Sequence, residues 1–311
     1  MPSAAFAVII YSVIYMLNVF PEYYKTFKCI GGKCRHSCCI GWEIDIDEET
    51  MKKYEALGGD VGKRLAENIS REDTPHFILG ENERCPFLNK DGLCDLILEC
   101  GEDMLCEICT EHPRFHNYLP GRTESGLGLC CEEASRFIID TPDPLMLICE
   151  GSPDGCDERS MSVILLRDEL LYLANDTSVP YEERVQNILS RCDVSLTERS
   201  LSQWAEYYLS LERMDDEWTS LLEKLRDSNI PELKYDHRHV NLLTYFLYRH
   251  MPGVYEDDNI HGRAGFAVLS TYIIAALCAV CGDEEIYNIS RLYSAEIEYS
   301  DVNLDAIFDL F

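Results

Sequence analysis

Cysteine is the residue type in this chain whose number and spacing could do chemistry. Eleven of the sixteen cysteines lie between residues 29 and 131, and they come in tight groups. Their positions are Cys29, Cys34, Cys38, Cys39, Cys85, Cys94, Cys100, Cys106, Cys109, Cys130 and Cys131. Short spacings bring several sulfurs within reach of one centre, and thiolates are soft anionic ligands suited to zinc or iron–sulfur clusters. The pattern therefore predicts a metal- or cluster-binding protein.

A disulfide framework is the alternative use of so many cysteines. Such a framework suits a small secreted chain that cannot bury enough core, whereas this chain has 311 residues and is 46% hydrophobic. Adjacent cysteines such as Cys38 and Cys39 are also awkward to bridge to each other. We therefore favour metal binding over disulfides or free buried thiols, and we expect a cytoplasmic protein. The cysteines outside the groups should be mostly buried apolar residues: Cys149, Cys156, Cys192, Cys278 and Cys281.

The charge balance excludes one large class of partners. The formal net charge is -29 at pH 7, and a protein that binds a nucleic-acid backbone needs clustered Lys and Arg. Residues 22–39 are basic although the whole chain is acidic, because they contain Lys25, Lys28, Lys33 and Arg35 and only one acidic residue, Glu22. Cations beside thiolates favour their deprotonation, although a basic surface loop explains the same residues. We expect neither nucleic acid nor a membrane as a partner.

The start of the chain needs separate treatment. Residues 4–20 are apolar and uncharged, but they are short for a spanning helix and lack the basic start of a signal peptide. Met16 comes directly before the first recognisable motif. We interpret residues 1–15 as an extension from an upstream start codon, with a membrane anchor as the alternative.

The rest of the chain divides by its pattern. Residues 16–145 are rich in cysteine and interrupted by Gly and Pro, with a helical stretch over 48–67 that breaks near Gly58 and Gly59. Residues 160–311 show apolar positions with the helical period, including strongly apolar runs at 241–250 and 264–281. We predict a mainly α fold, in which an irregular cysteine-rich N-terminal domain with little sheet packs against an all-α C-terminal domain.

Four ordered motifs carry a family resemblance. They are Cys38-Cys39-Ile-Gly-Trp42, Cys85-Pro-Phe-Leu88, Leu105-Cys106-x2-Cys109-x2-His112-Pro-Arg114 and Leu129-x-Cys131-x-Glu133-Ala-x-Arg136. With Pro21-Glu-Tyr-Tyr-x3-Phe27-Lys-Cys29 before them, they resemble the flagellin lysine-N-methylase family over residues 16–140. The middle block also resembles cysteine-cluster proteins described as zinc- or iron-chelating. A weaker likeness continues through Arg249-His250. His112 and Cys130 depart from the pattern, and Cys100 has no clear place in it.

The resemblance implies methyl transfer from S-adenosylmethionine to a lysine side chain, with flagellin as the acceptor and an iron–sulfur cluster, 4Fe-4S, in the protein. Zinc is the alternative metal. The predicted ligands, which should converge in space around one or two centres, are Cys29, Cys34, Cys38, Cys39, Cys85, Cys94, Cys106, Cys109 and Cys131. The sequence lacks the strand–G-x-G–helix fingerprint of the usual Rossmann methyltransferases. It also lacks the C-x3-C-x2-C cysteine spacing of radical-type S-adenosylmethionine proteins, because Cys34-x3-Cys38 would need a third cysteine where the chain has Gly41.

Methyl transfer to lysine sets its own requirements. The ε-amine, with an unperturbed pKa near ~10.4, must lose a proton before it attacks the methyl group. Glu133 is our candidate base, with helix-start charge as its alternative role; Glu43, Asp45 and Asp47 are further carboxylates near the motifs.

Three other residues are candidates for the cofactor site. Arg114 and Arg136 could bind the carboxylate of S-adenosylmethionine or form structural salt bridges. Trp42 could stack on the adenine or belong to the core. Two other functions stay open, an iron–sulfur redox or electron-transfer protein and a non-catalytic zinc-binding module.

Overall fold

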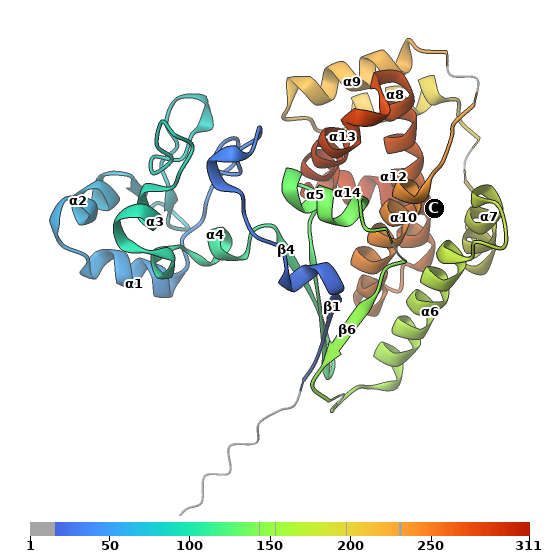
Figure 1. The fold of residues 1–311 in the computed structure, drawn as a ribbon, viewed down its shortest axis with the longest axis horizontal. Helices are drawn as coiled ribbons and strands as arrows, with labels where there is room; N and C mark the ends of the chain where they lie inside the picture. The colour runs from blue at the N-terminus through green and yellow to red at the C-terminus, as the bar shows by residue number, and fades with distance from the viewer. Residues whose placement is uncertain (1–15, 143, 153, 197, 230–231) are drawn as a thin grey trace, which may run out of the picture.

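The computed structural model describes residues 16–142, 144–152, 154–196, 198–229 and 232–311. Residues 1–15 lie outside the described residues, so their interpretation as an extension stays a prediction. The described chain is mainly helical, with a small four-stranded sheet, and this confirms a mainly α fold. Figure 1 shows a small lobe that carries α1 to α4 on one side and a larger helical body on the other.

The small lobe, residues 44–109, has a hydrophobic core of its own. Its helices are α1 (Glu48–Ala56), α2 (Gly59–Glu67), α3 (Asp95–Cys100) and α4 (Glu107–Glu111), with a hairpin of β2 (Ile69–Ser70) and β3 (His76–Phe77). The break between α1 and α2 falls at the predicted Gly58 and Gly59. Buried Ile44, Ile46 and Phe77 belong to this core.

One carboxylate fixes two of these helices to each other. Asp47 caps α1 by accepting the Thr50 amide at 2.8 Å, and its second oxygen accepts the Glu107 amide at the start of α4 at 2.9 Å. This double use satisfies free amides at two helix starts with one side chain.

A mixed sheet lies between the small lobe and the body. Its strands are β4 (Arg114–Leu119), β5 (Arg122–Leu127), β1 (Leu17–Pro21) and β6 (Leu147–Glu150), in that spatial order. β1 pairs parallel to β5 and antiparallel to β6, and β4 and β5 form a hairpin that turns at Gly121, whose φ is 69°. The stretch between the two predicted domains, residues 146–159, therefore contains a strand, β6.

The body is all helical from residue 158 onward within the described residues. Its helices are α6 (Glu158–Asn175), α7 (Tyr181–Arg191), α8 (Leu201–Ser210), α9 (Asp216–Arg226), α10 (His237–His250), α11 (Val254–Asp257), α12 (Ile260–Cys281), α13 (Ile286–Tyr293) and α14 (Asp301–Phe308). The earlier helix α5 (Glu132–Ile139) packs into the same core, as do Phe27 and Leu127. The cysteine-rich stretch thus contributes to both cores.

α12 is the central helix of the body. It is long and apolar enough to cross a membrane, with a mean hydropathy of 2.1 over its most apolar stretch, but 78% of that stretch is buried inside the protein. It contacts α10, α13, α14 and α9, which cover it (Figure 1). This burial is that of a core helix.

A buried ion pair joins the sheet to the body. The Arg167 guanidinium on α6 and the Glu124 carboxylate on β5 are both fully buried and meet through two hydrogen bonds of 2.6 and 2.9 Å. Arg122 also donates to Glu124 at 2.6 Å. If a buried carboxylate loses a positively charged partner, the free-energy cost of removing the carboxylate from water remains and is no longer offset.

We expect Arg167→Met to destabilise the protein by at least about 2 kcal/mol, because Glu124 would keep only Arg122. Urea unfolding measures the change. The matched control is Arg191→Met, which removes the half-exposed ion pair between Arg191 on α7 and Glu169 on α6 and should destabilise the protein much less, because exposed ion pairs contribute little to stability. Equal losses in the two variants would contradict a special role for the buried pair.

Candidate metal centre

The predicted ligand cysteines lie in two groups. The lobe sulfur group belongs to the small-lobe core and consists of Cys39, Cys85, Cys94, Cys106 and Cys109. The α5 sulfur group lies where the segment before the lobe meets α5 and consists of Cys29, Cys34 and Cys131; the first and last of these raise the pKa of Cys34, and Cys29 raises that of Cys131. Cys38 lies between them, because it interacts with Cys39 on one side and with Cys29 and Cys131 on the other. All sixteen cysteines are free thiols.

Short backbone pairings hold the lobe sulfur group together. The Cys85 amide donates to the Cys39 carbonyl at 2.9 Å, and isolated bridges pair Ile40 with Arg84 and Leu88 with Cys94. These contacts bring the first and second cysteine motifs side by side. The Cys106 and Cys109 thiols hydrogen-bond to each other across one turn of α4.

Three of the predicted ligands stand directly before helices. Cys94 precedes α3, Cys106 precedes α4 and Cys131 precedes α5. The amides of the first turn point back toward the preceding residue and favour a negative charge there. These amides lower the pKa of each thiol, whereas burial raises it. The fold thus offers thiolate-stabilising donors at three positions.

A salt bridge closes the α5 sulfur group. Glu132 is the first residue of α5, and its side chain is only 4% exposed. It accepts from the Arg35 amide at 3.3 Å, from Arg35 Nε at 3.2 Å and from Arg136 at 2.7 Å. Because Cys34 directly precedes Arg35 and Cys131 directly precedes Glu132, this salt bridge brings the two cysteines near each other.

Burial and neighbouring thiols set the charge of these cysteines. Burial raises the pKa of Cys34 to about 11, with Cys131 and Cys29 adding to the effect, and burial likewise raises the pKa of Cys85 to about 11. A hydrogen bond from Cys38 lowers the pKa of Cys39 to about 7 and raises that of Cys38. Most of the thiols must therefore lose protons when a metal binds, so metal affinity should rise with pH.

Trp42 and His112 form a pair beside Cys38. The Trp42 indole donates to the Cys38 carbonyl, and its ring lies 5.6 Å from the His112 ring. Trp42 is half-buried, so it is not a core residue. The Nε2 atom of His112 is buried and has no hydrogen-bond partner among the described residues. A buried ring nitrogen without a partner is costly unless it meets a ligand or water.

The other predicted site residues already have protein partners. Glu133 is 21% exposed and lies 3.7 Å from the Arg136 guanidinium, which also covers the Tyr287 ring. The Arg114 guanidinium lies over the rings of Tyr24 and Phe27, at 5.7 and 5.8 Å. Glu133 and Arg136 thus border the α5 sulfur group through α5.

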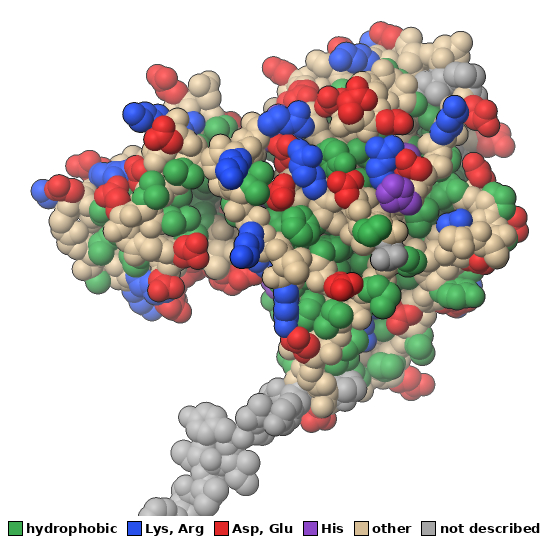
Figure 2. Space-filling model, in the orientation of Figure 1, with side chains coloured by type: hydrophobic (Ala, Val, Ile, Leu, Met, Phe, Trp, Pro, Cys, Tyr) green, Lys and Arg blue, Asp and Glu red, His purple; other side chains and the backbone are tan. Residues whose placement is uncertain are grey.

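Several residues that surround Cys130 were not predicted from the sequence. Burial raises the pKa of the Cys130 thiol to about 12, while interactions with the Tyr299 hydroxyl and the Arg249 guanidinium lower it. Arg291 interacts with the same thiol from α13. Only the weak likeness around Arg249-His250 could have indicated this environment. Figure 2 shows Lys and Arg side chains gathered along the face where the lobe meets the body.

The remaining cysteines differ in part from expectation. Cys192 and Cys278 are buried as expected, Cys156 and Cys281 are half-buried, and Cys149 is exposed on β6.

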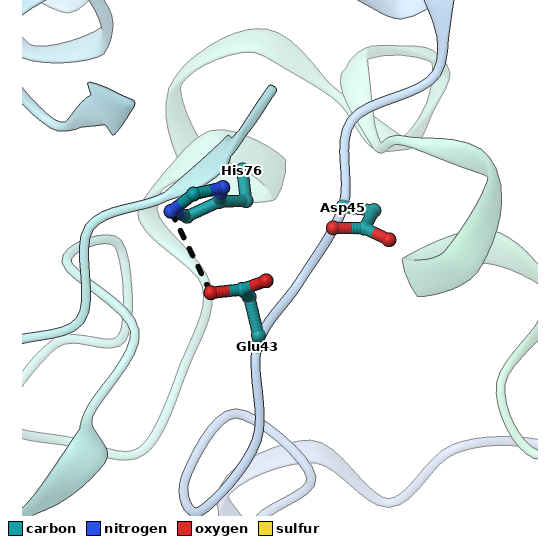
Figure 3. A group of neighbouring side chains, drawn as sticks. All are labelled: Glu43, Asp45 and His76. Atoms are coloured by element: carbon teal, nitrogen blue, oxygen red, sulfur yellow. Dashed lines mark ion pairs between the residues drawn. The ribbon is translucent and has the colours of Figure 1, made fainter. Parts of the chain in front are cut away.

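An oxygen and nitrogen donor group lies elsewhere on the small lobe. Ligand atoms of Glu43, Asp45 and His76 all lie within 4.8 Å of one another (Figure 3). His76 Nδ1 lies 2.9 Å from the Thr74 carbonyl, to which it must donate, and Nε2 lies 3.5 Å from Glu43. The two carboxylates are exposed, so the group amounts to a solvated ion pair of small energetic weight.

The sulfur spacing tests which metal group fits. Within the described ranges, no three cysteine sulfurs approach one another as closely as the Glu43, Asp45 and His76 atoms do. A single zinc ion, bound at ~2.3 Å by each sulfur, needs them that close. An iron–sulfur cluster spreads its thiolates over several irons and tolerates wider spacing. The thiol-rich donor sets fit the soft thiolate chemistry of an iron–sulfur cluster, with zinc as the alternative metal, and the unpartnered His112 nitrogen is a further donor of a type that zinc also binds.

His112 gives a testable pH dependence. Burial lowers its pKa to about 4 in the folded protein, below the usual value of 6.5. The unfolded chain therefore binds a proton that the folded chain does not between pH 6.5 and 4, so the histidine lowers stability as the pH falls through that window, by up to about 3 kcal/mol.

We expect His112→Gln to flatten the loss of stability between pH 6.5 and 4. Anaerobic urea unfolding across this range measures it. The exposed His237→Gln should keep the wild-type pH profile. An unchanged slope in His112→Gln would contradict the burial argument.

Comparison with known proteins gives partial matches to lysine methylases. Over 136 residues the chain is 30% identical to the lysine-N-methylases of Salmonella typhimurium and Salmonella choleraesuis, a match that covers 41% of this chain and 33% of each of those proteins. Over 136 residues it is 29% identical to the flagellar biosynthetic protein FliU of Salmonella muenchen, covering 41% of this chain and 79% of FliU. No family model matches the chain, and no solved structure matches it. The match thus spans about a third of the length of the curated lysine-N-methylases, to which this chain is similar over that part.

Proposed function

We propose that the protein is a cytoplasmic protein-lysine N-methyltransferase that uses S-adenosylmethionine, contains a 4Fe-4S cluster and methylates flagellin. The names of the similar proteins, lysine-N-methylase and FliU, support the reaction and the acceptor. The observation that carries the proposal is the α5 sulfur group, which sits at the start of the helix that also bears Glu133 and Arg136. A cluster site and a candidate base thus share one short helix.

The reaction needs a neutral amine and an aligned methyl donor. The lysine nitrogen attacks the methyl carbon of the sulfonium, the carbon–sulfur bond breaks, and S-adenosylhomocysteine leaves with the electron pair. The proton leaves the ε-amine for a carboxylate, for which we propose Glu133. Its partial exposure of 21% leaves it open to a substrate side chain, and Arg136 at 3.7 Å orients it.

The sulfur groups would hold the cluster. Cys29, Cys34, Cys38 and Cys131 form one set of four thiols, and the lobe sulfur group forms a second set. A bound cluster would supply iron that can polarise the donor. The chain's own part is to hold the thiols in place, and Trp42, whose ring lies beside His112, would stack on a flat ring or on the sulfonium.

We expect Cys38→Ser to lose both iron and methylation, because the Cys38 thiol interacts with Cys39 of the lobe sulfur group and, electrostatically, with Cys29 and Cys131 of the α5 sulfur group. Iron and sulfide analysis of anaerobically purified protein, together with peptide mass spectrometry of flagellin, measures the two losses. The exposed Cys149→Ser should keep both. Full iron content in Cys38→Ser would exclude that cysteine as a ligand.

The variant Glu133→Gln distinguishes a catalytic base from a residue that only supports the metal site. It should keep iron, lower methylation by about 10²-fold or more, and shift the remaining activity toward higher pH, where the free amine is more abundant. The matched control is Glu107→Gln, an exposed acid in the first turn of α4. Unchanged activity in Glu133→Gln would remove it as the base.

The decisive experiment supplies iron-loaded protein with S-adenosylmethionine and flagellin. Added methyl groups on lysine peptides would support the proposal. Iron-loaded protein that fails to bind S-adenosylmethionine would overturn it in favour of a redox protein, and zinc in place of iron and sulfide would favour a structural zinc module.

A further inference from the structure

A buried polar network surrounds Cys130 beside the α5 sulfur group. Its centre is Glu298, fully buried at the end of a π-helical turn, Ser294–Glu298. Glu298 accepts from His250 at 2.7 Å and from the Tyr245 hydroxyl at 3.0 Å, and it lies 3.3 Å from Arg249 Nε. Tyr245 also accepts from Arg249 Nη1 at 2.8 Å. Arg249 is therefore held rigidly from one side.

The other side of Arg249 faces Gly128 and Tyr299. A Cβ atom placed on Gly128 would lie 2.9 Å from the Tyr299 hydroxyl and 3.1 Å from Arg249 Nη1. The guanidinium lies between the rings of Phe115 and Tyr299, at 4.8 and 5.0 Å. Gly128 thus permits a close approach that any larger residue would block.

Arg249 keeps donor capacity for a ligand. Its side chain is 11% exposed, and its Nη2 group makes no hydrogen bond to any residue that the structure describes. Tyr299 is 46% exposed, so the corner opens to solvent. The arginine is fixed, charged and only partly used, as a recognition residue would be.

A second guanidinium adds positive charge. Arg291 also acts on Cys130, and its side chain donates to Asn288 at 3.1 and 3.2 Å. Burial lowers the pKa of Arg291, whereas Asp215, Glu217 and Glu132 act on the same guanidinium and raise it. Arg291 therefore already has counter-charges in the protein. Arg249 has one close carboxylate, Glu298, and an Nη2 group without a hydrogen bond among the described residues, so it can still bind an anion.

We propose that Arg249 and Tyr299 recognise the carboxylate of the methyl donor's amino-acid moiety. This inference rests on the proposed function. A guanidinium binds a carboxylate through its N–H donors, and the Nη2 group of Arg249 is available for such a contact. Cys130 adjoins Cys131, so a ligand bound here by its carboxylate would place its sulfonium beside the α5 sulfur group and Glu133.

The test truncates the ligand. Iron-loaded protein is titrated calorimetrically with S-adenosylhomocysteine, which carries the carboxylate, and with 5′-methylthioadenosine, which lacks it. Arg249→Lys should weaken binding of the first by about 10-fold or more and leave the second unchanged, because lysine lacks the planar N–H donors with which a guanidinium binds a carboxylate. Arg263→Lys is the matched control, because it is 15% exposed, pairs with Asp257 and covers Phe308 at 4.9 Å. It should change neither affinity.

Two milder variants test the same site even if Arg249→Lys fails to fold. Tyr299→Phe removes only a hydroxyl, and Gly128→Ala fills the corner; both should weaken S-adenosylhomocysteine selectively. Equal effects on both ligands, or no effect on either, would overturn the carboxylate site while leaving the methylase proposal intact. Binding of neither ligand to the wild-type protein would overturn both.

Discussion

The carboxylate of Glu132 is the interaction on which the arrangement of the candidate site depends. It is 4% exposed, yet hydrogen bonds from Arg136 and Arg35 outweigh burial and keep its pKa low. Arg35 is bound through both its amide and its side chain, so the contact fixes backbone as well as charge. Without it the loop that carries Cys34 would lose its ionic contact with α5, and the buried Glu132 carboxylate would lose one of its two partners. Phe27, which packs against Phe137 of α5, would remain as the apolar contact of this segment with the helix.

Different interactions hold the two sulfur groups in place. The lobe sulfur group is packed into an apolar core, where backbone bridges bring distant motifs side by side. The α5 sulfur group relies on ion pairs at the edge of the body. In both, cysteines that precede helices present sulfur to the free amides of a first turn, which partly offset the rise in thiol pKa that burial causes at Cys94 and Cys131.

Periodicity predicted the helices well, because apolar spacing reports burial directly. The break at Gly58 and Gly59 and the core helices around 241–250 and 264–281 are confirmed. The four-stranded sheet is larger than expected, since β1 lies in an apolar run without alternation and β6 lies among turn residues. Spacing also could not divide the cysteines into two groups, which long-range backbone pairing decides. The network at Arg249 escaped notice because Glu298 lies far away in sequence.

The separate core of the small lobe has a consequence for how the protein matures. Residues 44–109 are few to sustain an independent core, and five thiols occupy part of that core. If a metal group binds there, its binding energy is folding energy for the lobe, so cofactor insertion and lobe folding become one event. Oxidative loss of the group would then loosen the lobe as a whole and expose its apolar side chains. Oxygen damage would appear as proteolytic sensitivity of this lobe, while the helical body, with its own core, stays intact.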